Sequence, residues 1–302
     1  MTIAIRQIHS VETVDRHGRS RSFVGEVSGI DITRPMSPDE VAAIDEGMDR
    51  YAVLVFHDQK LTDEAQMAFS RRLGPLENAR GGNITKPEDR RLTVGMGDVS
   101  NLGKDGRILE RDSRQRAFNI GNMLWHSDSS YRVIPAKYSL LSARVVNPKG
   151  GNTEFADMRA AYDALEAETK AEIEGLVCEH SLLHSRGLLG PLDYTEEERA
   201  MFTPVRQRLV RTHPSTGCKS LYLSAHAGAI VGMPMAEARI LLRDLTEHAT
   251  QPAFVYAHVW RPWDFVMWDN RRTMHRVRRY DDRHPRDMRR TTLAGDAPTV
   301  GP

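Results

Sequence analysis

The chain has 302 residues, of which 40% are hydrophobic and 27% are charged, as is ordinary for a soluble globular protein. Lys and Arg number 42 and Asp and Glu 41, so the net charge of +1 indicates no nucleic-acid partner, and no apolar run is long enough to span a membrane. The only cysteines, Cys178 and Cys218, suit a reducing compartment, and we therefore expect a cytoplasmic protein.

The N-terminal part alternates strand and helix signals. Residues 23–32 alternate in polarity and contain two glycines, which predicts a twisted or bulged strand. The sequence Ser37–Glu40 has the pattern of a capping box and predicts a helix that begins there. Residues 53–56 are apolar throughout and predict a short buried strand. A second helix is expected over 62–73, capped by a threonine and ended by Gly74-Pro75.

The segment 77–121 has a different character. It is rich in Gly, Asn, Arg and Asp, and its apolar residues show little periodicity. A polar stretch of this length inside a compact domain is usually a functional lid or a loop. We therefore predict a lid-like loop at about 77–121.

Strand signals dominate the rest of the chain, apart from helical spacing at 156–176 and 235–250. The expected strands are 138–146, 209–212, 221–224, 254–260 and 265–268. No repeat or linker divides the sequence, so we expect a single domain over 1–302. Many short strands with helical insertions predict a mainly β fold, a jelly roll with flanking α-helices.

Three residues carry metal-binding chemistry. His126 and Asp128 are two residues apart, so in a strand both side chains would point to the same face. A third ligand, His275, would complete a 2-His-1-carboxylate facial triad, which leaves coordination sites open on iron(II). Each of these residues alone fits a polar strand end or a surface loop equally well, so the hypothesis depends on their combination.

Arg286 follows His275 by eleven residues, in a segment crowded with arginine. A C5 dicarboxylate chelated to iron at one end needs a cation for its far carboxylate. Arginine supplies a planar, two-pronged donor for that purpose. A solvated basic loop is the simpler interpretation of the composition, and only the spacing distinguishes Arg286.

Taken together, these motifs resemble a known family. They are Trp125–Asp128 (WHSD), Gly150–Thr153 (GGNT), Trp268–Arg271 (WDNR), His275 and Arg286. In this order they resemble the taurine and 2,4-dichlorophenoxyacetate dioxygenase family of iron(II)- and 2-oxoglutarate-dependent dioxygenases. The resemblance covers nearly the whole chain and implies a double-stranded β-helix, the cupin-like jelly roll of that superfamily.

The resemblance also implies roles for individual residues. His126, Asp128 and His275 would bind Fe(II), while O2 would be a co-substrate. Thr153, Arg286 and Trp268 would bind 2-oxoglutarate, although a purely structural role in the core stays open for Trp268. Contacts with an organic acid substrate are expected from five residues: Arg290, Asn122, Ser129, His213 and Lys86. Asn122 and Ser129 could equally be structural, and a structural role is the simpler interpretation of His213.

The stretches 124–131, 153–165, 209–217 and 266–281 are similar to family members that act on aryloxyalkanoic acids. This similarity implies hydroxylation of a 2,4-dichlorophenoxyacetate-like acid next to its ether oxygen. The products would be a phenol and glyoxylate, with succinate and CO2. We expect the protein to form a homo-oligomer. Its binding partner is expected to be a small-molecule substrate.

Three alternatives remain open. The same chemistry could act on taurine, another sulfonate or a small carboxylic acid. A non-catalytic cupin-like binding protein could keep the metal ligands without turnover. A zinc hydrolase could use the same three ligands, but it would leave Thr153 and Arg286 without a purpose.

Overall fold

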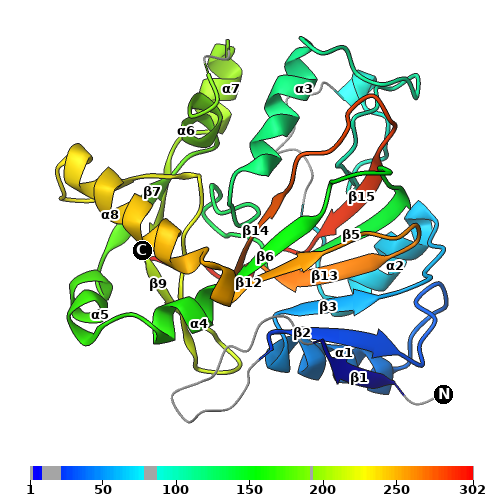
Figure 1. Ribbon diagram of the computed structural model, residues 1–302, viewed down its shortest axis with the longest axis horizontal. Coiled ribbons are helices and arrows are strands. Elements are labelled where there is room, and N and C mark those ends of the chain that lie inside the picture. Colours follow the sequence, from blue (N-terminus) through cyan, green and yellow to red (C-terminus); the bar gives the residue numbers. More distant parts are fainter. Residues whose placement is uncertain (1–2, 9–21, 78–86, 191–192, 302) are drawn as a thin grey trace.

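The computed structural model describes residues 3–8, 22–77, 87–190 and 193–301. The chain is mainly β-structure with flanking helices, as the sequence predicted (Figure 1). Over these residues, none of the helices has both the length and the apolar character that crossing a bilayer requires.

A seven-stranded sheet forms the larger half of the fold. All of its neighbouring strands are antiparallel except β2 and β3, which are parallel. In spatial order the strands are β1 (Ala4–Gln7), β2 (Val24–Ser28), β3 (Val53–Phe56), β13 (Phe265–Asp269), β5 (Tyr138–Val145), β15 (Asp287–Thr292) and β4 (Gly97–Asp98). The strand predicted at 23–32 is shorter than expected, because Gly29 leaves the β region with a φ of 76°.

A smaller antiparallel sheet packs on one face of the large one. Its strands are β12 (Val255–His258), β6 (Thr153–Asp157) and β14 (Thr273–Val277). A shared hydrophobic core lies between the two sheets, where the ring of Phe155 on β6 contacts Trp268 on β13 at 5.4 Å between centroids. Two facing sheets agree with the predicted jelly roll, although neither closes into a barrel within the described residues.

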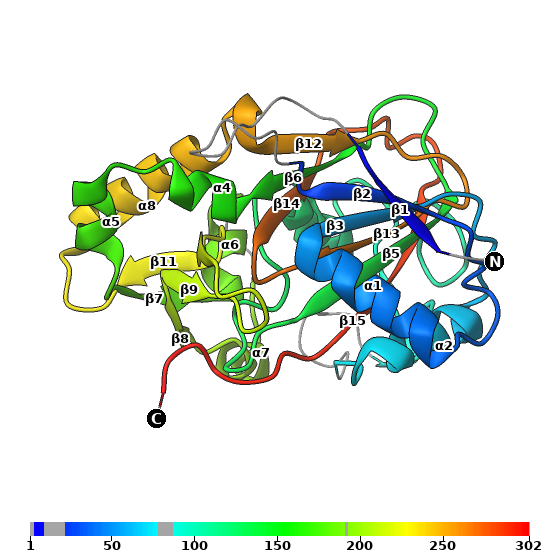
Figure 2. The same cartoon turned by 90° about the horizontal axis from the view of Figure 1, so that it is seen from below.

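Two helices cover the other face of the large sheet. Along β3, Val53 and Val55 point to the core between the sheets, while Leu54 and Phe56 point to the helices. These helices are α1 (Pro38–Arg50) and α2 (Asp63–Leu73), which lie across the sheet in Figure 2. The predicted capping box of α1 and the threonine cap of α2 are both confirmed.

Most of the remaining elements form a third hydrophobic core beside the sandwich, and Leu182 and Phe202 form a small separate cluster with Phe118. Residues 156–176 are not one helix as expected, because β6 extends to Asp157, whose carboxylate caps a short helix that ends at Asp163. The predicted helix at 235–250 is confirmed as α8. This region comprises α4 (Met158–Asp163), α5 (Ala167–Ile173), β7 (Val177–His180), α6 (Leu182–Gly187), α7 (Glu196–Met201), β8 (Val205–Arg208), β9 (Val210–Thr212), β10 (Lys219–Leu221), β11 (Ala227–Ile230), α8 (Met235–Ala249) and η4 (Pro252–Phe254).

The described part of the segment 77–121, for which a lid-like loop was predicted, contains four short elements. It contains η2 (Pro87–Asp89), β4, α3 (Arg114–Asn119) and η3 (Ile120–Met123). β4 pairs with β15, and Arg91 forms ion pairs with Asp98 and Asp287 at 2.8 and 2.7 Å, which attaches the segment to the sheet. These elements are too short to give a periodic pattern of apolar residues in the sequence.

Asp269, at the end of β13, anchors a buried charge network. Its carboxylate accepts hydrogen bonds from Arg271 at 2.8 and 2.9 Å and lies 2.9 Å from Nε2 of His213. Burial raises the pKa of Asp269, but the charge of Arg271 and the hydrogen bond from His213 outweigh burial and hold that pKa far below its usual range. The carboxylate is therefore ionised and compensates nearby cations that have no access to water.

We expect Asp269→Asn to lower the free energy of unfolding by about 3–5 kcal/mol, because it leaves Arg271 buried without its anion. Urea unfolding followed by circular dichroism measures the change. Asp244→Asn is the matched control, since Asp244 pairs with Arg243 on the exposed surface of α8, and its effect should stay within about 0.5 kcal/mol. A loss below about 1 kcal/mol for Asp269→Asn would contradict this interpretation.

Candidate active site

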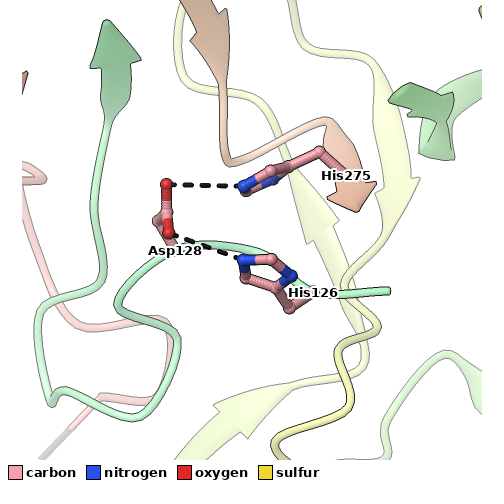
Figure 3. A group of neighbouring side chains, drawn as sticks. All are labelled: His126, Asp128 and His275. Atoms are coloured by element: carbon pink, nitrogen blue, oxygen red, sulfur yellow. Dashed lines mark ion pairs between the residues drawn. The ribbon is translucent and has the colours of Figure 1, made fainter. Parts of the chain in front are cut away.

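The three predicted metal ligands meet in one place. His126 and Asp128 lie on one loop segment and His275 on β14, with their side chains facing one another (Figure 3). His126 Nε2 is 3.8 Å from Asp128 Oδ1, and His275 Nε2 is 3.6 Å from Asp128 Oδ2. Among the described residues, this is the only group of three or more His, Cys, Asp or Glu whose donor atoms lie within 4.8 Å of one another.

The backbone that presents these ligands is a single β-bridge and not the strand end that the spacing suggested. His126 donates its N–H to His275 O at 3.0 Å, and His275 donates back to His126 O at 2.8 Å. After His126 the chain turns, and Ser129 has a φ of 55°. The turn brings Asp128 back beside the two imidazoles.

The protonation states suit a cation. Burial lowers the pKa of both His126 and His275, so each imidazole is neutral and can offer a lone pair. Nδ1 of His126 lies 2.7 Å from Leu124 O, and a hydrogen bond there leaves Nε2 as the free donor atom. Burial raises the pKa of Asp128, but the charge of Arg290 outweighs burial and keeps the carboxylate ionised.

A layer of polar side chains holds Asp128 in place. Ser139 donates to Asp128 Oδ2 at 2.6 Å, and the backbone N–H of Asp128 donates to Asn270 Oδ1 at 3.1 Å. Trp268 donates its indole N–H to the same oxygen at 3.1 Å, and its ring lies 4.7 Å from that of His275. Trp268 is buried in the core between the sheets, so its contacts with Asn270 and His275 fix these side chains from the core side.

Arg286 is a buried cation. Its side chain is 3% exposed, and in the part of the chain that the structure describes no carboxylate pairs with its guanidinium. Burial lowers the pKa of Arg286 to about 10. Its guanidinium carbon lies 5.2 Å from the centroid of Tyr280, and a Cβ on Gly151 would come within 2.7 Å of its Nη1. Glycine at 151, with a φ of 78°, therefore makes room for the guanidinium.

Arg286 lines a cavity of about 410 Å³, which we call the Arg286 cavity. Asn122 and Tyr280 also line it. A cavity of this size that contains an uncompensated arginine fits a small dicarboxylate.

Thr153 lies at the start of β6, two residues after Gly151. Its hydroxyl oxygen accepts the indole N–H of Trp260 at 2.9 Å. Because an indole N–H can only donate, the hydroxyl hydrogen of Thr153 is left for another acceptor, and it has none among the described residues. Thr153 is not among the residues that line the Arg286 cavity, and its contact with 2-oxoglutarate stays a prediction that the free hydroxyl hydrogen allows.

We expect Trp260→Phe to weaken 2-oxoglutarate binding about fivefold to tenfold, because the Thr153 hydroxyl then loses the bond that orients it. Calorimetry with N-oxalylglycine, a 2-oxoglutarate analogue, measures this without turnover. In a Thr153→Val background the same change should have no further effect. Trp263→Phe is the matched control and should leave the affinity unchanged; additive losses in the double variant would refute the coupling.

A second cavity, of about 110 Å³, lies on the side of Arg290, and we call it the Arg290 cavity. Asn122, Ser129 and Arg290, all predicted to contact the substrate, line it. Arg290 donates to Asp128 Oδ1 at 2.5 Å, and Ser129 donates to Glu77 at 2.8 Å. Asn122 lines both cavities, so the predicted substrate and co-substrate regions adjoin.

Two further predicted contacts are not brought to this site. His213 is buried in the Asp269 network and lines neither cavity, so the structure favours the structural alternative for it. Lys86 lies outside the described residues.

Sequence reasoning also missed residues that the structure brings to the site. Ser139 and Trp260 act on predicted residues through hydrogen bonds that only the fold reveals. Asn270 could have been found, since it belongs to the WDNR motif. Arg186 lines the Arg290 cavity and carries no local signal in the sequence.

Several known proteins are similar to this chain in sequence. The family model described as taurine catabolism dioxygenase TauD, TfdA family matches residues 15–292. The chain is 48% identical over 277 residues to an alpha-ketoglutarate-dependent 2,4-dichlorophenoxyacetate dioxygenase from Cupriavidus pinatubonensis, covering 91% of this chain and 96% of the relative. It is 41% identical over 256 residues to an (S)-phenoxypropionate/alpha-ketoglutarate-dioxygenase from Sphingobium herbicidovorans, covering 82% and 83%.

A solved structure is similar over the full length. The crystal structure of AAD-2 in complex with Mn(II) and N-oxalylglycine matches with a TM-score of 0.93 and 65% identity, covering 99% of this chain and 100% of that one. This likeness confirms the predicted cupin-like jelly roll. The chain therefore belongs to the taurine catabolism dioxygenase TauD, TfdA family and is a 2-oxoglutarate-dependent dioxygenase.

Proposed function

We propose that this protein hydroxylates an aryloxyalkanoic acid of the 2,4-dichlorophenoxyacetate type next to its ether oxygen. The ether then breaks to a phenol and glyoxylate, while 2-oxoglutarate and O2 are converted to succinate and CO2. The observation that carries the proposal is the meeting of His126, Asp128 and His275 beside two arginine-containing cavities. Relatives named for 2,4-dichlorophenoxyacetate and (S)-phenoxypropionate support the substrate class.

In this proposal His126, Asp128 and His275 would hold iron(II), since their donor atoms lie close together and form the 2-His-1-carboxylate set that suits this metal. Iron(II) with 2-oxoglutarate supplies the activation of O2 that C–H hydroxylation needs. Thr153 and Arg286 bind the far carboxylate of 2-oxoglutarate by a hydroxyl hydrogen bond and an ion pair.

The remaining residues position the substrate and exclude water. Arg290 binds its acidic group, with Asn122 and Ser129 on the walls of the same cavity. Trp268 packs against His275 and keeps that ligand dry. Because the reacting carbon must lie near the metal while the acid lies near Arg290, the distance between the two sites selects the length of the acid.

The test is succinate release by the iron(II)-loaded enzyme with a panel of acids. We expect release with 2,4-dichlorophenoxyacetate, matched by an equal amount of the phenol, and little with taurine. Release with taurine or a small aliphatic acid alone would move the substrate to the first alternative. Binding without any release would favour a non-catalytic protein.

A further inference from the structure

Arg186, on α6, lines the Arg290 cavity. Its side chain is buried, with 6% of the residue exposed. Four arginines line the cavity, Arg90, Arg132, Arg186 and Arg290, of which Arg186 comes from α6 and Arg290 from β15. A positive charge this deep needs a compensating group.

No such group pairs with Arg186 among the described residues. Among these residues it donates one hydrogen bond, from Nη1 to Ser185 Oγ at 3.3 Å, and its Nε is buried without a partner. The carboxylates that line the cavity face other arginines, since Glu77 lies 3.5 Å from Arg132 and Asp98 lies 2.8 Å from Arg91. Asp128 accepts from Arg290 at 2.5 Å.

Contacts with Phe118 and Gly121, and not an ion pair, hold the Arg186 side chain. Its guanidinium carbon lies 4.6 Å from the ring centroid of Phe118. A Cβ on Gly121 would come within 2.2 Å of the same carbon, so the guanidinium lies directly against the Gly121 backbone. The chain thus keeps this cation in a fixed place within the cavity.

Without a bound anion, the buried charge of Arg186 is unfavourable. Burial lowers the pKa of Arg186, and the like charge of Arg290 lowers it further. A bound anion would remove both penalties, since it would compensate two arginines at once. The cavity volume of about 110 Å³ is several times that of a water molecule, about 30 Å³, and accommodates an acidic head group.

We propose that Arg186 is a substrate-binding residue that holds the carboxylate of the acid from one side while Arg290 holds it from the other. The inference rests on the proposed function, because it requires an acidic substrate in this cavity. Arg290 already gives its Nη1 to Asp128, so a second arginine supplies donors that Arg290 lacks. The chain would therefore select an acid over its neutral analogues.

The test compares an acid with its neutral amide in the Arg186→Gln variant. Binding of 2,4-dichlorophenoxyacetate and of 2,4-dichlorophenoxyacetamide is measured by calorimetry, with iron(II) and N-oxalylglycine bound. We expect the affinity for the acid to fall on the order of a hundredfold. The affinity for the amide should change less than about threefold, so the preference for the acid is lost.

Arg206→Gln is the matched control, since Arg206 is exposed on β8, and it should leave both affinities unchanged. Equal losses for acid and amide would mean that Arg186 only shapes the cavity, and would overturn the proposal, as would no loss at all. If Arg186→Gln no longer binds N-oxalylglycine, Arg186→Lys decides. It keeps the charge without the fork and should lower acid affinity about tenfold with amide affinity intact; any other pattern overturns the proposal.

Failure of the proposed function has a different signature. If wild-type enzyme releases no succinate with any aryloxy acid, the substrate assignment fails. The acid–amide comparison is then made with whichever carboxylate or sulfonate does drive release. If the Arg186→Gln variant no longer prefers that acid over its amide, the proposal that Arg186 and Arg290 hold the acid from two sides is still supported. If the variant keeps this preference, the proposal is overturned.

Discussion

Replacing His275 by alanine is expected to lower substrate-dependent succinate release by at least about a thousandfold. The change removes one of three protein donors from the candidate iron site, and the remaining pair, His126 and Asp128, comes from one short turn. Two ligands cannot fix the coordination geometry that a bound co-substrate and O2 require. The His275→Ala protein should also lose iron on gel filtration, which metal analysis measures directly.

The control for this variant is His284→Ala, which removes a half-exposed histidine near Asp281 and should leave iron content and turnover unchanged. Thermal unfolding of His275→Ala separates a metal defect from a folding defect. Retained iron and turnover within tenfold of wild type would contradict the assignment of His275. Hydrolysis of a substrate by the zinc(II)-loaded wild-type protein, without succinate release, would instead favour the hydrolase alternative.

Local sequence predicted the elements whose causes are local. The helix α1 begins after Ser37 because a capping box needs only residues three apart, and β3 is recognisable because all of its residues are buried. The helical spacing over 156–176 was misleading because β6 continues to Asp157, and its pairing with β12 and β14 is not local information. Tertiary pairing therefore decided this boundary.

Some residues of the candidate site could also be predicted from local sequence, and others could not. His126, Asp128 and His275 could be predicted because they belong to ordered motifs, even though the predicted strand at 126–128 is a single bridge and a turn. Arg186 could not be predicted, because its role depends on α6 lying beside Gly121 and facing Arg290. His213 shows the opposite case, a motif-adjacent histidine that the fold uses for a buried hydrogen bond to Asp269.

Arg286→Gln is expected to have opposite effects on binding and on stability. The KM for 2-oxoglutarate should rise about a hundredfold or more, since the far carboxylate loses a buried charge-assisted pair, while kcat at saturation changes little. In the protein without ligand, the same change should raise the free energy of unfolding by about 1 kcal/mol. Arg286 is buried, and among the described residues only the ring of Tyr280 stabilises its charge, so the neutral amide removes a desolvation penalty.

Both effects can be measured on one preparation, by calorimetry with N-oxalylglycine and by urea unfolding of the metal-free protein. Arg278→Gln is the matched control, because Arg278 is about half exposed and faces Glu154 at 3.6 Å; it should change neither quantity by much. A fall in stability for Arg286→Gln would mean that the arginine holds the fold together. A rise in stability with a loss of affinity is the signature of a cation that is kept, at a cost to folding, for the ligand it binds.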